Sequence, residues 1–135
     1  PQIYKCVIAG GVVPDSVNYL NNFRSQLNTQ KDSAYSRAYL NFWLDSVNPM
    51  KDVQKINVPM LMIHGDDDQR TPAKPVRDYI KLLEKHNKDF DVLWMDGADH
   101  FFNTWFHHHK LEMYTSINDF IDQKCNFKSE SVASR

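Results

Sequence analysis

The sequence lacks any long apolar segment and any large excess of charge of one sign. Its longest apolar run, residues 58–63, is far shorter than the roughly 18 residues that a membrane-spanning helix needs. Sixteen Lys and Arg residues balance seventeen Asp and Glu residues, which leaves a net charge of -1. We therefore expect neither a membrane protein nor a nucleic-acid partner, because nucleic-acid binding needs a concentrated basic field.

Cysteine is also scarce, since Cys6 and Cys125 are the only two thiols in the chain. A structural zinc site uses closely spaced pairs of cysteines, and two isolated cysteines do not provide them. Two buried free thiols and a single disulfide both remain open from this count alone.

The rest of the composition is that of an ordinary globular domain. The 135 residues are 41% hydrophobic and 24% charged, a balance that disfavours disorder and leaves room for one domain. Residues 1–126 carry the structural patterns, whereas residues 127–135 form a polar tail that we expect to fray. The sequence begins at Pro1, without an initiator Met, and a strand-like run follows almost at once. We expect the chain to be a piece of a longer protein.

The pattern of apolar residues predicts alternating strands and helices. Short β-branched, aromatic or apolar runs predict strands over residues 3–9, 58–64 and 90–95. The second run is apolar almost throughout, as is typical of a strand buried on both faces of a parallel sheet. Apolar residues at helical spacing predict helices over residues 72–88 and 105–124. This alternation favours an α/β fold with parallel strands and helices on both faces of the sheet.

Further predictions concern the apolar sides of the helices and the first part of the chain. Residues 12–31 predict a long connection, residues 33–48 a helix, and residues 50–57 one helical turn followed by a loop. The apolar sides of the two later helices consist of Val76, Ile80, Leu82 and Leu83 in the first, and of Leu111, Tyr114, Ile117, Phe120 and Ile121 in the second.

Two polar loops follow the second and third predicted strands. The first contains three consecutive aspartates, Asp66, Asp67 and Asp68, and the second contains His100. Parallel strands end at one edge of a sheet, and neighbours lie only about 5 Å apart, so an aspartate of the first loop can reach His100. A His general base needs such an orienting carboxylate. The alternative interpretation is a solvated turn with backbone-capping aspartates and a surface His.

A resemblance to α/β-hydrolases rests on two motifs, His64-Gly65-x-x-Asp68-x-x-Thr71-Pro72 and, after a helix and a strand, Gly97-x-x-His100. More narrowly, the chain resembles the prolyl oligopeptidase family of serine peptidases, which includes dipeptidyl peptidases and acylaminoacyl peptidases. The resemblance covers nearly the whole chain and implies that residues 1–126 are the C-terminal half of an α/β-hydrolase catalytic domain. It implies that Asp68 is the acid and His100 the base of a Ser-Asp-His triad. Asp66 and Asp67 are then neighbours without a catalytic role, and His64 packs at the strand end.

The same resemblance suggests substrate-binding residues. Arg70 stands where part of the family has an Arg that holds a substrate carbonyl, a task that suits a planar guanidinium. The alternative is that Arg70 neutralises the three aspartates. Thr71 is a candidate for lining the specificity pocket. The aromatic residues at the places of the family's pocket wall, for most of which the alternative is a core position, are Tyr19, Phe23, Tyr35, Tyr39 and Trp43.

The serine nucleophile of the family lies on a Gly-x-Ser-x-Gly turn, and the 135 residues contain no such turn. The resemblance places the serine roughly 15 residues before Pro1, about one helix length, in a missing N-terminal part of the hydrolase domain. The implied function is hydrolysis of a peptide substrate without a cofactor, and this chain alone is expected to be inactive. The alternatives are another hydrolase, such as a carboxylesterase or acyl transferase, and an inactive hydrolase-like binding module. A homo-oligomer is left open.

Three consecutive histidines at residues 107–109 suggest a metal site at first sight. Adjacent residues on a helix point about 100° apart, so three in a row do not converge on one ion. We therefore expect no metal.

The resemblance also bears on the two cysteines. In the dipeptidyl peptidase branch, similar cysteines in a strand and at the end of the last helix are bridged, which implies a disulfide between Cys6 and Cys125. Such a bridge would place the protein in an oxidising compartment: secreted, periplasmic or at a cell surface. Two separate buried thiols remain the alternative.

Overall fold

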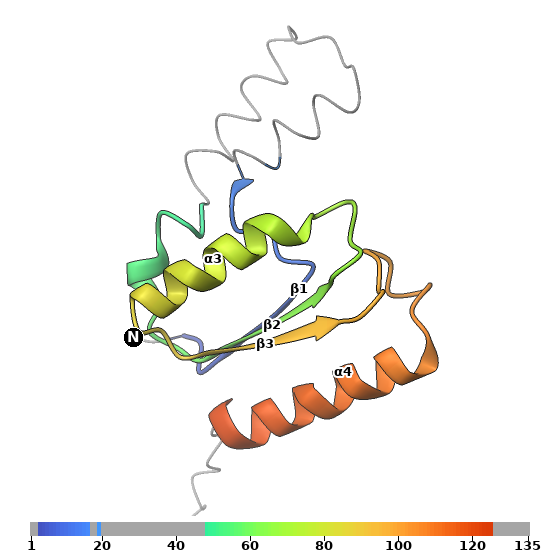
Figure 1. Ribbon diagram of the computed structural model, residues 1–135. Coiled ribbons are helices and arrows are strands. Elements are labelled where there is room, and N and C mark those ends of the chain that lie inside the picture. Colours follow the sequence, from blue (N-terminus) through green and yellow to red (C-terminus); the bar gives the residue numbers. More distant parts are fainter. Residues whose placement is uncertain (1–2, 17–18, 20–47, 126–135) are drawn as a thin grey trace, which may run out of the picture.

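The described part of the chain forms a three-stranded parallel sheet with helices on both sides (Figure 1). The computed structural model describes residues 3–16, 19 and 48–125. The strands lie in the order β1-β2-β3, and both pairs are parallel, which confirms the α/β prediction. The elements are β1 (Val7–Gly10), η1 (Val53–Lys55), β2 (Met60–Gly65), α3 (Ala73–Lys85), β3 (Phe90–Met95), α4 (His107–Phe120) and the π-helical turn η2 (Ile121–Cys125).

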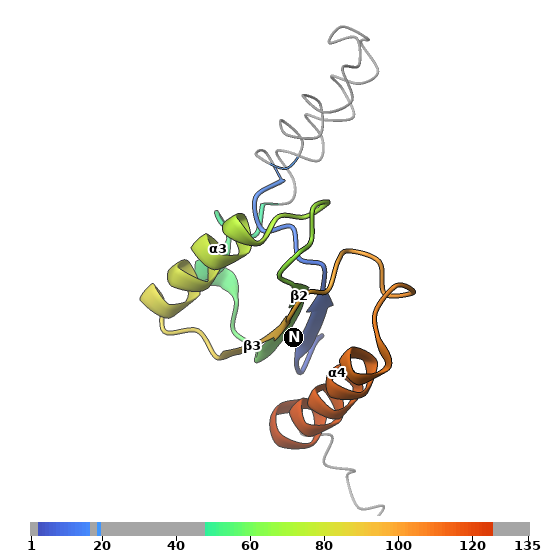
Figure 2. The ribbon, with the colours of Figure 1, turned by 45° about the vertical axis from the view of Figure 1, so that its right-hand side comes forward.

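The central strand β2 is buried on both faces, as its apolar run predicts. Its side chains alternate, so that Leu61 and Ile63 face one side of the sheet and Met60 and Met62 face the other. Figures 1 and 2 show α3 and α4 on opposite sides of the sheet. Buried residues on the α3 side include Tyr79 and Leu83, and those on the α4 side include Met95, Phe120 and Cys125.

The first strand is shorter than predicted. β1 begins at Val7, whereas Ile3 and Tyr4 are 83% and 68% exposed, so the prediction of a strand over residues 3–6 is wrong. The N–H of Val7 donates to the carbonyl of Pro59, and β2 begins only at Met60. Because Pro59 has no amide N–H, the ladder with β2 does not continue in that direction, and no other described strand pairs with residues 3–6.

Helix α3 ends earlier than the apolar pattern indicates. The pattern extends to residue 88, but the helix ends at Lys85. Asn87 adopts a φ of 50°, the left-handed conformation that commonly terminates a helix. Tyr79 is buried in this helix beside Val76 and Leu83, although the pattern did not include it.

Helix α4 is rotated relative to the prediction. Leu111 and Tyr114 are 60% and 55% exposed, so their assignment to the apolar side is wrong. Met113 packs against the core in their place, together with Ile117 and Ile121. Residues 113, 117 and 121 recur every fourth position and share one face, whereas residue 114 falls at the edge of that face and residue 111 on the far side of the helix.

The remaining predicted elements fall partly outside the described residues. The helical turn expected within residues 50–57 is η1, which confirms that prediction. The tail, most of the connection over residues 12–31 and all but the last residue of the helix predicted over residues 33–48 lie outside the described part. Among the described helices, none is long and apolar enough to cross a membrane.

A disulfide connects the two ends of the fold. Cys6, next to β1, is bonded to Cys125, the last residue of η2, with Cα atoms 5.2 Å apart. The bond joins residues 119 positions apart in the sequence. In the chain-entropy model, closing a loop of this length stabilises the folded state by roughly 4–5 kcal/mol.

Candidate active site

Three strand ends meet at one edge of the sheet. Gly65 of β2 pairs with Met95 of β3, so the loops that follow start at the same level. We call residues 66–72 the acid loop and residues 96–106 the base loop. Gly11, after β1, has a φ of 57°, and a Cβ atom there would lie 3.4 Å from Cε1 of His100. The ends of all three strands therefore border His100.

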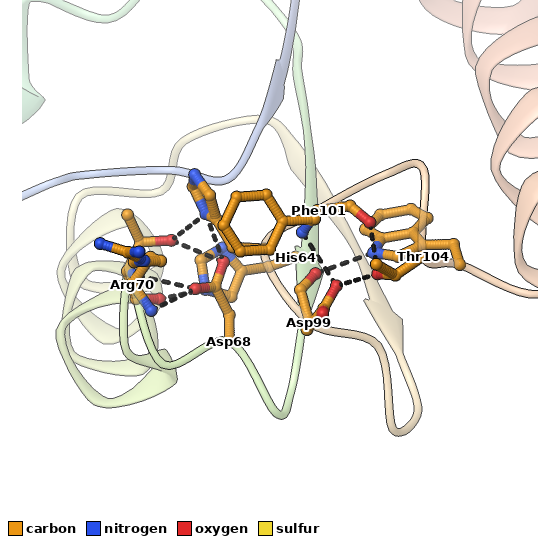
Figure 3. A network of polar contacts seen from close by, with 9 residues as sticks. His64, Asp68, Arg70, Asp99, Phe101 and Thr104 are labelled. Carbon is orange, nitrogen blue, oxygen red and sulfur yellow. Dashed lines mark hydrogen bonds and ion pairs between the residues drawn. The ribbon is translucent and has the colours of Figure 1, made fainter.

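Asp68 is the aspartate that faces His100. Its side chain is 1% exposed, and Nδ1 of His100 lies 2.9 Å from Oδ2. The other carboxylate oxygen, Oδ1, accepts from the backbone N–H groups of Arg70 and Thr71 at 2.8 and 2.7 Å. The Thr71 hydroxyl donates to Oδ2 at 2.7 Å. Figure 3 shows these bonds converging on Asp68, so both oxygens are held by four donors.

These donors keep Asp68 ionised. Burial acts to raise its pKa, because it removes water from the charged form. The hydrogen bonds from the backbone and hydroxyl of Thr71, from His100 and from the backbone of Arg70 outweigh burial, and the pKa lies below its ordinary value. Asp68 is therefore a carboxylate at neutral pH.

His100 has Nδ1 engaged by Asp68, whereas Nε2 has no hydrogen-bond partner within the described part of the chain. Because an ionised carboxylate only accepts hydrogen bonds, Nδ1 carries the proton that is shared with Asp68. Nδ1 also lies 3.3 Å from the Thr71 hydroxyl oxygen. Among the described residues, nothing is hydrogen-bonded to Nε2, and the side chain is 36% exposed. The basic lone pair of Nε2 is thus available to a group that approaches from outside the described fold.

The acid and base loops are joined at their beginnings. Oδ1 of Asp66 accepts the backbone N–H of Gly97 at 2.7 Å. The N–H of Asp67 donates to the carbonyl of Ala98 at 3.2 Å. A Cβ atom on Gly65 would lie 2.1 Å from that same carbonyl oxygen, so only glycine permits this approach. The interpretation of Asp66 as a mere neighbour missed this contact.

The base loop is also braced within itself. Oδ1 of Asp99 accepts the N–H of Phe101 at 2.9 Å and the hydroxyl of Thr104 at 2.5 Å, as Figure 3 shows. Nε1 of Trp105 donates to the Asp99 carbonyl at 2.8 Å. Sequence reasoning did not single out Asp99. An Asp in a loop commonly accepts the backbone N–H two residues further on, and this turn signal could have found it.

His64 supports the acid loop from within the core. Its ring is fully buried, as its predicted place at the strand end implies, and Nε2 lies 2.7 Å from the carbonyl of Thr71. The Trp94 ring meets it edge-on at 5.6 Å. Burial lowers the pKa of His64, and the carbonyl only accepts, so the ring is neutral with its proton on Nε2.

The two substrate-binding candidates lie in different settings. Arg70 is exposed, and its guanidinium carbon lies 5.8 Å from the centre of the Phe101 ring, which in turn meets the His100 ring edge-on. No ion pair found among the described residues involves Arg70, so its side chain does not neutralise the three aspartates. Thr71 is 4% exposed, and its hydroxyl is bound to Asp68. It braces the pair instead of facing an open pocket.

The other candidates have no recorded contact with the pair among the described residues, or they lie outside those residues. Tyr19 is partly exposed, whereas Phe23, Tyr35, Tyr39 and Trp43 are not described. In the histidine tract, His107 and His108 are exposed, while His109 is buried with Nε2 2.9 Å from the carbonyl of Asp96. Over the described ranges, no three potential metal ligands gather at one point.

Comparison with known proteins gives one family and one fold. The pattern that defines the prolyl oligopeptidase family matches residues 1–128. The acylaminoacyl peptidase of Pyrococcus horikoshii is similar in structure, with a TM-score of 0.71 and 15% identity over 96% of this chain and 22% of that one. A puromycin-hydrolyzing peptidase of Mycobacterium tuberculosis is also similar, with a TM-score of 0.69 and 16% identity over 95% of this chain and 20% of that one.

An esterase of Thermogutta terrifontis is similar as well, with a TM-score of 0.64 and 17% identity over 87% of this chain and 43% of that one. At these identities the likeness establishes the α/β-hydrolase fold, of which the chain forms a C-terminal half. The chain spans about a fifth of the length of the two peptidases.

Proposed function

This chain belongs to the prolyl oligopeptidase family, and from that premise we propose that it supplies the acid and the base of a serine peptidase. The observation that carries the proposal is the 2.9 Å contact between Nδ1 of His100 and the buried carboxylate of Asp68. Asp68 orients the ring and stabilises the imidazolium that forms when Nε2 takes a proton.

The proposed reaction uses both nitrogens of His100. Nε2 removes the proton from a serine hydroxyl as the oxygen attacks the scissile carbonyl, and it later returns the proton to the leaving amine. Nδ1 keeps its proton throughout and donates to Asp68. The serine and the oxyanion donors come from a part of the protein beyond these 135 residues, because the sequence holds no Gly-x-Ser-x-Gly turn.

We further propose that the substrate is a peptide and that Arg70 binds it. The Arg70 side chain is exposed beside Phe101, one residue from His100, so its guanidinium can reach a carbonyl near the reacting bond. A fork of fixed donors suits a peptide carbonyl. The disulfide supports an extracytoplasmic location for the parent protein, because such bonds persist in oxidising compartments.

The test is the substitution His100→Ala in the complete parent protein. Removing the proton carrier should lower kcat towards aminoacyl anilides by about 10⁴-fold or more, because only binding and oxyanion stabilisation would remain. His107→Ala is the matched control, since it removes an exposed histidine seven residues away and should leave kcat unchanged.

Three results would contradict the proposal. Equal activity of the His100→Ala variant and the unaltered protein would remove His100 from the reaction. If the parent protein hydrolysed short esters but no aminoacyl anilides, it would be an esterase and not a peptidase. A parent protein in which no serine reacts with a fluorophosphonate probe would instead indicate an inactive binding module.

A further inference from the structure

The distance between His100 and Asp68 depends on how the two loops are joined. Asp68 is held by three donors from residues 70 and 71 of its own loop, so its position is set locally. His100 lies 32 residues further along the chain. Its approach to Asp68 therefore requires that the base loop stay in place against the acid loop.

Few contacts hold the beginnings of the two loops together. Two of them are backbone hydrogen bonds: the N–H of Asp66 donates to the carbonyl of Met95 at 3.1 Å, and the N–H of Asp67 donates to the carbonyl of Ala98 at 3.2 Å. The third and shortest hydrogen bond is made by the side chain of Asp66, whose Oδ1 accepts the N–H of Gly97 at 2.7 Å. A backbone N–H that donates to a carboxylate makes a charge-assisted bond, which is stronger than a neutral one.

The bond falls on the turn that opens the base loop. Gly97 has a φ of 65°, the left-handed conformation, and stands three residues before His100. Holding its N–H fixes the plane of the peptide that enters this turn. The next residue, Ala98, places its carbonyl against Gly65 and Asp67, so the turn and the close approach are neighbouring parts of one junction.

We infer that Asp66 is a positioning residue, whose carboxylate fastens the base loop to the acid loop and thereby sets the distance between His100 and Asp68. It touches neither ring nor reacting atoms and acts through Gly97. This inference rests on the proposed catalytic role of His100. It assigns a task to the first of the three aspartates, which the triad does not use.

The chain offers a matched set of variants. Asp66 and Asp67 are adjacent, exposed and equally charged, but the Asp67 carboxylate accepts from the side chain of Gln69 in its own loop. Asp66→Ala removes the bond to Gly97, Asp66→Asn keeps an accepting oxygen without the charge, and Asp67→Ala removes a carboxylate that does not join the loops. All three substitutions are made in the complete parent protein.

The expected result is a split between the variants. Asp66→Ala should lower kcat towards aminoacyl anilides about tenfold with KM unchanged, since a small displacement of a catalytic group has effects of this size or larger. Asp66→Asn should stay within about twofold of the unaltered protein, as should Asp67→Ala. In ¹H–¹⁵N spectra of histidine-labelled protein, the Nδ1–H signal of His100 should shift in Asp66→Ala alone.

The outcomes separate this inference from the proposed function. Equal kcat and spectra in Asp66→Ala and Asp67→Ala would overturn it, and so would an Asp66→Asn variant more impaired than Asp66→Ala, because an accepting oxygen at residue 66 would then be of no benefit. If His100→Ala keeps full activity, the proposed function fails. The Nδ1–H signal still decides whether Asp66 positions the ring, because that signal needs no turnover.

Discussion

The acid loop and the base loop hold their key side chains in opposite ways. Asp68 is 1% exposed at its side chain and accepts four hydrogen bonds, three of them from within its own loop. His100 is 36% exposed at its side chain, and its Nδ1 points to Asp68 and the Thr71 hydroxyl. The acid loop therefore buries the Asp68 side chain, whereas the base loop leaves the His100 side chain partly exposed.

The difference matches the two tasks of a proton-transfer pair. A carboxylate that orients and stabilises an imidazolium works best when it is fixed and kept ionised, as the donors around Asp68 ensure. A base that takes a proton and returns it needs one free nitrogen and access to the substrate. The buried, fully bonded Asp68 and the accessible His100 fit the roles proposed for them, and three substitutions test this contrast.

The largest effect is expected from Asp68→Asn, which keeps the size of the anchored side chain but removes its charge. The amide no longer stabilises the imidazolium and can hold the ring in the wrong tautomer, so kcat should fall by about 10⁴-fold. Steady-state kinetics of the parent protein measure the change. Asp67→Asn is the control, and a comparable loss there would mean that the charge of the whole loop matters more than the Asp68 contact.

The second substitution, Gly65→Ala, separates the two loops physically. The new Cβ would lie 2.1 Å from the Ala98 carbonyl, so the backbone must move, at a cost of about 3 kcal/mol in the free energy of unfolding. Thermal unfolding should show a clear decrease in Tm. Gly10→Ala, where no atom lies within 4 Å of the new Cβ, should change stability by no more than about 0.5 kcal/mol. Equal Tm values for both variants would contradict the close junction.

The smallest effect is expected in the pH dependence of stability, and it arises from His64, which supports the acid loop from within the core. The pKa of His64 is lowered in the folded state, so the unfolded chain binds a proton first as the pH falls. Stability should decrease below about pH 6.5, the ordinary histidine value. Asp68, whose pKa is also lowered, adds a second loss at more acidic pH, as the pH falls below the ordinary aspartate value towards the folded one.

Thermal unfolding from neutral pH down to pH values below the ordinary aspartate pKa tests this expectation. His64→Gln keeps a donor for the Thr71 carbonyl but does not titrate, so the first decrease should become smaller while the second remains. The exposed His107→Gln serves as control and should leave both in place. An unchanged pH profile in His64→Gln would show that His64 is not the group responsible.

Sequence reasoning reached the pair itself but not its supports. Residue type and topology indicate His100 and one aspartate of the preceding loop, because both loops follow predicted strands that end at the same edge. The resemblance to the α/β-hydrolases selected Asp68 among the three aspartates. Asp66 and His64 bind the backbone N–H of Gly97 and the backbone carbonyl of Thr71. Every residue apart from proline carries both groups, so a sequence gives no sign of which one a distant side chain will meet.

Packing likewise decided details that the apolar pattern left undetermined. Leu111 and Met113 are both apolar, and the pattern chose the former, but Met113 faces the core. The rotation of α4 about its axis depends on what it covers, which includes Ile63 of β2 and Met95 of β3. A periodic pattern gives the width of a buried stripe, and the neighbouring surface selects which residues fall within it.

By itself, the sequence determined the features that depend on neighbouring residues. An apolar run bounded by Pro59 and Gly65 makes a buried strand, and Asp68 accepts from N–H groups only two and three residues away. Only the tertiary structure decided that Asp66 meets Gly97, and only it fixed the geometry in which Asp68 meets His100 and Cys6 meets Cys125. The physical reason is range, because local bonds follow from backbone geometry, whereas contacts 31 to 119 residues apart exist only once the sheet and both helices have packed.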